Sequence, residues 1–101
     1  MIVYNVTINA NDSISNEFIT WMKHEHIPDV MATRLFTAYN LYKLITKQPD
    51  ENGTTYVVQY FAASIEDYNK YQQDYAPALQ QKTLQKFGQQ VSAFRSLMEG
   101  I

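Results

Sequence analysis

The sequence contains no cysteine, and only three of its 101 residues are glycine and three are proline. The absence of cysteine excludes disulfide bonds, thiol chemistry and every metal centre that requires a thiolate ligand. The few glycines and prolines, together with a hydrophobic content of 46%, exclude intrinsic disorder and low-complexity sequence. A chain of this length forms one small domain, because a second hydrophobic core would not fit.

Charged residues are also scarce, at 18% of the chain, and the formal net charge is -2. Eight basic residues against ten acidic ones leave no excess of cations for a phosphate backbone, so we expect no nucleic-acid partner. No stretch approaches the roughly 20 apolar residues that span a bilayer. The first residues alternate with period two, unlike a secretory signal. We therefore expect no membrane partner and a cytoplasmic location.

What the sequence does contain is a regular succession of strand and helix patterns. Four segments alternate in polarity or are dense in β-branched and aromatic residues, which predicts strands: residues 2–9, 36–46, 54–62 and 91–98. Apolar residues at helical spacing predict helices after the first and third of them. The order β-α-β-β-α-β predicts an α+β, ferredoxin-like domain spanning residues 1–101, with a four-stranded antiparallel sheet and helices on one face.

Local signals set the expected boundaries of these elements. The first helix should begin after residues 11–13 and end near Ile27, because the residue before Pro28 resists helical dihedral angles. Residues 47–53 have the composition of a turn and join the second and third strands into a hairpin. Ser64 and Asp67 form a capping box for the second helix, which ends before Gly88.

Alternation along the strands predicts that both faces of the sheet are partly apolar. One face suits packing against the helices: Tyr4, Val6, Ile8, Tyr56, Val58 and Tyr60. The other carries Val3, Tyr42, Leu44, Val57, Phe61, Phe94 and Met98. A monomer rarely exposes so much apolar area. We therefore expect a homodimer that buries the open sheet face; the alternative is a monomer with a mixed outer face.

Both histidines of the chain lie in the segment from Trp21 to Val30. On a helix, His24 and His26 point about 200° apart, so they cannot bind one metal ion, and we expect no metal site. On an unbroken helix Glu25 would lie at the centre of the inward stripe, with His26 about 100° away. Either the helix frays and Glu25 reaches solvent, or a cleft at this helix end holds Glu25 and His26 as a catalytic pair, with His26 as general base.

Other candidate ligand-binding residues come from the strands. Tyr4, Tyr56 and Tyr60 point between sheet and helices, where together with Trp21 they either line an apolar pocket or form a packed core. Arg95 lies in an alternating apolar run, as an edge residue, an anion contact or a dimer contact.

Several blocks resemble a family of small bacterial proteins, the domain-of-unknown-function family 4286. They are M-I-V-Y-N-V-T at the start, W-M-K-x-x-H-I-P-D-V-M-A-T at 21–33, G-T-T-Y-x-V-Q-Y at 53–60, Y-A-P-A-L at 75–79 and F-G-x-x-V-S-A-F-R at 87–95. The resemblance covers nearly the whole chain. It implies a ferredoxin-like fold related to the dimeric α+β barrel proteins, and it implies no established activity.

The sequence His26-Ile27-Pro28 also resembles a motif of the EthD-like branch of those barrels, in which a histidine lies near a ligand cleft. Two hypotheses follow. The first is an uncharacterised homodimeric domain that binds a small apolar ligand or a protein partner. The alternative is a cofactor-independent, monooxygenase-like or isomerase-like enzyme with His26 as general base. Neither needs a cofactor. No histidine follows His26, whereas haem-degrading relatives place their haem ligand on the second helix.

Overall fold

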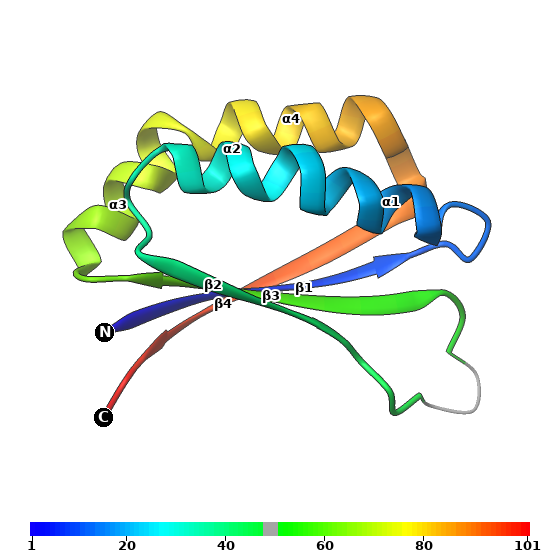
Figure 1. Ribbon diagram of the computed structural model, residues 1–101, viewed down its shortest axis with the longest axis horizontal. Helices are drawn as coiled ribbons and strands as arrows, with labels where there is room; N and C mark the ends of the chain where they lie inside the picture. The colour runs from blue at the N-terminus through cyan, green and yellow to red at the C-terminus, as the bar shows by residue number, and fades with distance from the viewer. Residues whose placement is uncertain (48–50) are drawn as a thin grey trace.

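The computed structural model describes residues 1–47 and 51–101. One layer of helices covers one face of a four-stranded sheet (Figure 1). The order of the elements is β1 (Ile2–Ala10), α1 (Ser15–Trp21), a π-helical turn (Met22–His26), α2 (Ile27–Ala32), β2 (Ala38–Lys43), β3 (Thr54–Ala62), α3 (Ile65–Asp74), α4 (Ala76–Phe87), a 3₁₀ turn (Gly88–Gln90) and β4 (Val91–Glu99). This is the predicted α+β, ferredoxin-like arrangement.

The strands lie in the order β2-β3-β1-β4, and every neighbouring pair is antiparallel. The central strands β1 and β3 pair along their whole lengths, from Ile2 opposite Ala62 to Ala10 opposite Thr54. Ile2 also lies opposite Glu99 of β4, so both chain ends lie at one end of the sheet (Figure 1). There, the amide of Gly100 donates a hydrogen bond of 2.9 Å to the carbonyl oxygen of Met1.

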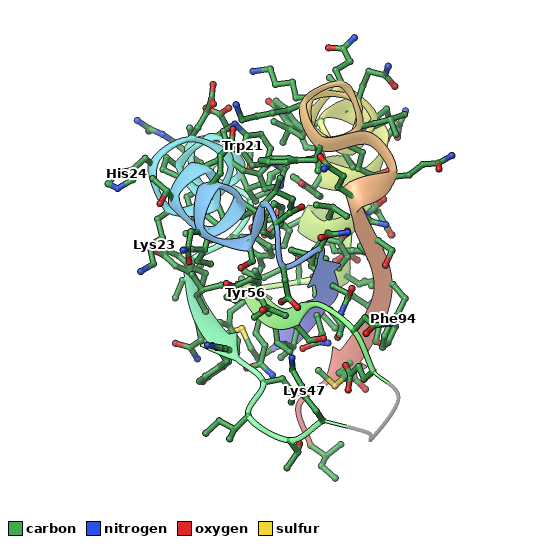
Figure 2. All side chains as sticks on the ribbon, turned by 90° about the vertical axis from the view of Figure 1, so that its right-hand side faces the viewer. Trp21, Lys23, His24, Lys47, Tyr56 and Phe94 are labelled. Carbon is green, nitrogen blue, oxygen red and sulfur yellow. The ribbon has the colours of Figure 1, made fainter. Side chains whose placement is uncertain are left out.

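The core lies between the sheet and the helices, as the alternation predicts. Every second residue of β1 is buried. All six residues expected on this face are buried: Tyr4, Val6, Ile8, Tyr56, Val58 and Tyr60. Figure 2 shows Tyr56 in this layer, with the sheet on one side and the helices on the other.

The opposite face of the sheet is exposed and partly apolar, as predicted. Phe94 of β4 is 64% exposed and lies opposite Thr7, whose other neighbour is Val57 of β3. Figure 2 shows Phe94 on the side of the sheet away from the helices. Tyr42, Leu44 and Met98 are also exposed. We call this face the outer face.

Four strand boundaries differ from the sequence prediction: both ends of the second strand, the end of the last, and the end of the first, which runs one residue further, to Ala10. The second strand is shorter than residues 36–46, because Phe36 leaves the sheet and packs in the core with its ring 4.8 Å from that of Tyr71. The last strand runs one residue further, to Glu99. The turn expected at residues 47–53 includes residues 48–50, which lie outside the described part. Gly53 has φ +83°, and a Cβ there would lie 2.7 Å from the carbonyl oxygen of Ala10.

The prediction that the first helix ends near Ile27 is wrong. Helical backbone runs from Ser15 to Ala32 and contains a π-turn at Met22–His26, closed by the Ile27 amide bonding to the Met22 carbonyl five residues earlier. Pro28 then occupies the first turn of α2, where an amide hydrogen is not needed. A π-turn is a single wider turn within an α-helix, and it accommodates one extra residue.

The second helical segment follows the prediction. The Ser64 hydroxyl accepts a hydrogen bond of 3.2 Å from the Asp67 amide. The helix breaks at Tyr75, restarts with Pro77 in the first turn of α4, and ends at Phe87 before Gly88, which has φ +57°. Within the described ranges, no helix is long and apolar enough to cross a bilayer.

Candidate functional site

A cavity of about 50 Å³ lies between the sheet and the helices and is partly open to solvent. Its floor comes from β1, β3 and β4, and its walls come from the α1–α2 segment, α3 and α4. We call it the His26 cavity. It is lined by Tyr4, Val6, Ile8, Phe18, Met22, His26, Val58, Tyr60, Tyr71, Gln80, Thr83, Val91, Ala93 and Arg95.

Two aromatic clusters flank the cavity. In the first, the Tyr4 ring lies 6.1 Å from the Tyr60 ring and 6.0 Å from the Tyr71 ring. In the second, the Phe18 ring lies 6.1 Å from that of Tyr56, and the Trp21 ring lies 5.4 Å from that of Phe87. Figure 2 shows Trp21 extending from its helix towards the α4 layer. Because rigid rings stand on both sides, the shape of the cavity is fixed by packing.

The π-turn decides which residue of the Glu25–His26 pair faces the cavity. On a regular α-helix, Glu25 would follow Trp21 and Met22 on the inward face. The extra residue in the π-turn shifts that face by one position, so His26 and the buried Ile27 turn inward. Glu25 is exposed, as in the reading that it reaches solvent. Glu25 is exposed because the π-turn adds one residue to the helix. The helix does not fray at this point, since α2 follows directly.

The side chain of His26 is strongly affected by burial. Its Nδ1 is buried and has no hydrogen-bond partner in the described residues. Burial lowers the pKa of His26 from 6.5 to about 4; the charge of Asp29 opposes this shift, and that of Arg95 adds to it. The imidazole is therefore neutral at pH 7. The carboxylate of Asp29 pairs with Lys82 at 3.5 Å, and within the described residues it forms no hydrogen bond with the His26 ring.

Tyr60, which also lines the cavity, carries a second unpaired polar atom. Its hydroxyl is buried and has no hydrogen-bond partner in the part of the chain that the structure describes. Burial raises the pKa of Tyr60 well above its ordinary value, and the pKa of Tyr71 is raised for the same reason. Tyr60 therefore stays protonated at physiological pH, so its hydroxyl is available both to donate and to accept a hydrogen bond.

The residues singled out from the sequence fall into three groups. The structure brings Tyr4, Tyr60, His26 and Arg95 together around the cavity. Trp21 does not line the cavity, but its ring stacks against the imidazole of His26. Tyr56 and Glu25 lie apart from the cavity: the tyrosine packs against Phe18, and the carboxylate is on the outer surface of the helix. Among the described residues, no three histidine, aspartate or glutamate side chains gather as metal ligands would.

Sequence reasoning missed the contribution of α3 and α4. Gln80 and Thr83 reach the cavity from α4 and Tyr71 reaches it from α3. Gln80 and Thr83 are three residues apart on one helical face beside the buried Leu79. That spacing was a usable signal for a polar stripe at the edge of the core. Only the packing of α4 over the sheet shows that Gln80 and Thr83 line the same cavity as His26.

The whole chain matches one protein family. The model of the family described as "Domain of unknown function (DUF4286)" matches residues 1–101. Comparison with the curated proteins found no match.

Solved structures show the same fold at low sequence identity. An ethyl tert-butyl ether D (EthD) family protein from Bacillus halodurans matches with a TM-score of 0.72 and 11% identity over 100% of both chains. A dimeric ferredoxin-like protein from an uncultured marine organism matches with a TM-score of 0.66 and 12% identity, over 99% of this chain and 94% of that one. The cofactor-independent oxygenase SnoaB from Streptomyces nogalater matches with a TM-score of 0.61 and 10% identity, over 99% and 92%.

Proposed function

The chain belongs to the DUF4286 family, a domain of unknown function, and we propose from its own geometry that it binds a small, largely apolar molecule in the His26 cavity. One observation carries the proposal. His26 Nδ1 and the Tyr60 hydroxyl are both buried, both lack a hydrogen-bond partner among the described residues, and both belong to residues that line the same cavity. A molecule with an apolar body and one hydroxyl or carbonyl group would supply the missing partners.

Energetics supports this interpretation. A buried polar group without a partner destabilises a protein by about 1–3 kcal/mol, and native proteins keep few such groups without a reason. The remaining walls are mostly apolar or aromatic, with Val6, Ile8 and Val58 as the floor. Apolar walls with a few converging polar groups are typical of small-molecule sites. The enclosed space of about 50 Å³ is smaller than a benzene ring needs, so a ligand of that size would also occupy the part of the cavity that is open to solvent.

Titration with phenol tests the proposal, because phenol joins an aromatic ring to a single hydroxyl. We expect saturable binding to the wild type, followed by NMR. The variant Tyr60→Phe should bind about threefold to tenfold more weakly, because one hydrogen bond is lost. Tyr56→Phe is the matched control: the same change on the same strand and face, outside the cavity. Equal losses in the two variants, or no saturable binding, would contradict the proposal.

The outer face supports the second part of the proposal, a homodimer. Its exposed aromatic and apolar residues lie on the face opposite the helices, and one protein with this fold is described as dimeric. A second copy would cover this face without reaching the His26 cavity, which lies on the helix side of the sheet. Dimer formation and ligand binding are therefore separable. The cytoplasmic location and bacterial origin expected from the sequence stay predictions.

A second candidate function is base catalysis without a cofactor; one protein with this fold, SnoaB, is a cofactor-independent oxygenase. The observation that favours it is the neutral imidazole of His26, a residue that lines the cavity and whose Nδ1 has no partner in the described residues. Such a nitrogen accepts a proton from a carbon acid bound beside it, leaving an enolate and an imidazolium. With its pKa lowered to about 4, His26 is a weak base until an anion forms next to it.

Deuterium exchange tests this second function. The probe is 2-indanone, an apolar ketone whose α-protons exchange through an enolate. We expect the wild type in D₂O to exchange them faster than His26→Gln, while His24→Gln, which alters an exposed residue of the same segment, matches the wild type. Equal rates in the wild type and His26→Gln would exclude His26 as the base.

A further inference from the structure

Arg95 is the cationic residue that lines the His26 cavity. It lies on β4 opposite Val6, whose side chain is buried under the helices. Because residues paired across strands share a face, the Arg95 side chain projects to the helix side of the sheet. This register places the guanidinium on the same side as His26 and Tyr60.

Arg95 is exposed to solvent, and its guanidinium has no ion-pair or hydrogen-bond partner in the described residues. The three ion pairs found there use Lys70, Lys82 and Lys86, and no hydrogen bond of Arg95 is found. Its charge nevertheless acts on the cavity, since it lowers the pKa of His26 and opposes the raised pKa of Tyr71.

Neither carboxylate that acts on His26 forms an ion pair with Arg95 in the described part of the chain. Asp29 and Glu25 act to raise the pKa of His26, and Lys82 acts to lower it. The carboxylate of Asp29 is already paired with Lys82, and Glu25 is exposed on the outer surface of the helix. The cavity therefore combines a neutral imidazole, a neutral phenol and one unpaired cation.

We infer that the ligand of the His26 cavity carries an anionic oxygen, as a carboxylate or an ionised phenol or enol, which Arg95 binds. This inference rests on the proposed function and adds the chemical class of the ligand. The guanidinium is suited to oxyanions because its donors lie in one plane. The apolar remainder of the ligand would contact Ala93 at the cavity and Leu97, which is 42% exposed two residues beyond Arg95 on the same side of β4.

Benzoate and benzamide test the inference, because the two probes share a ring and a planar head and differ in charge. The protein carries His24→Gln, so that His26 gives the only histidine NMR signal. We expect benzoate to bind at least about tenfold more tightly than benzamide, as a charge-assisted hydrogen bond implies. Saturating benzoate should raise the pKa of His26, because a nearby anion favours the imidazolium, whereas benzamide should not.

Substitution of the two arginines assigns the effect. Arg95→Gln should abolish the preference for benzoate by weakening benzoate binding much more than benzamide binding. It should also raise the pKa of His26 in the free protein, because the charge of Arg95 lowers that pKa. The matched control is Arg34→Gln, which removes a guanidinium from a residue outside the cavity and should keep the preference.

Each outcome decides between the two proposals. Equal affinity for benzoate and benzamide, or an unchanged preference in Arg95→Gln, overturns the inference and leaves the cavity as a site for neutral ligands. Absence of saturable binding by either probe overturns both the inference and the proposed function.

Discussion

The imidazole of His26 lies against the indole of Trp21, with ring centroids 5.1 Å apart and ring planes 27° apart. Trp21 is the only tryptophan of the chain and is itself packed against Phe87. Trp21 packs against one face of the His26 ring, and His26 also lines the cavity. Trp21 is therefore both a support for His26 and an optical reporter of its state.

Tryptophan emission should follow the protonation of His26. We expect the emission of Trp21 to change with a midpoint near pH 4, the lowered pKa of His26, as an imidazolium forms against the indole. His26→Gln should remove this transition, and His24→Gln should keep it. Far-UV circular dichroism recorded alongside separates the transition from acid unfolding. A midpoint near 6.5 would show that His26 is solvated.

The stability of the protein should depend on pH through His26. The folded pKa of about 4 lies below the ordinary 6.5, so between these values the unfolded chain binds more protons than the folded one. Stability is therefore lost as pH falls from 6.5 to 4, by up to about 3 kcal/mol. Urea unfolding at a series of pH values measures it. His26→Gln should flatten the curve in this window, and a curve that His26→Gln leaves unchanged would contradict the assignment.

Removal of the unpaired Tyr60 hydroxyl should stabilise the free protein. Tyr60→Phe keeps the ring in its cluster and removes a buried polar atom without a partner, so we expect a gain of about 1 kcal/mol in the free energy of unfolding. The same variant should lose affinity for phenol. Tyr56→Phe serves as control and should show neither change. A destabilised Tyr60→Phe would mean that the hydroxyl has a partner.

A charge on the outer face should separate the proposed dimer. Phe94 is 64% exposed, so Phe94→Glu should leave the fold intact while placing a carboxylate in the buried interface. Light scattering should report about twice the chain mass for the wild type at micromolar concentration and a monomer for the variant. Leu84→Glu is the control, because Leu84 is 57% exposed on α4, in the helix layer. A monomeric wild type would refute the dimer.

Strand alternation was enough to predict the sheet and both of its faces, because a period of two leaves each residue a single possible face. The helix containing His26 was predicted less well. A π-turn adds one residue without a composition signal, and that residue exchanges the roles of Glu25 and His26. Tyr56 and Tyr60 are equivalent in the pattern, yet only Tyr60 reaches the cavity, because the packing of the helices decides where space remains.

Contacts between bound phenol and methionine methyl groups test the central claim most directly. Met22 lines the His26 cavity, and Met98 is exposed on the outer face, so the two methyl groups report on opposite sides of the sheet. In protein labelled at methionine methyl carbons, the account predicts intermolecular nuclear Overhauser effects between phenol and Met22. Effects to Met98 with none to Met22 would place the ligand outside the cavity and contradict it.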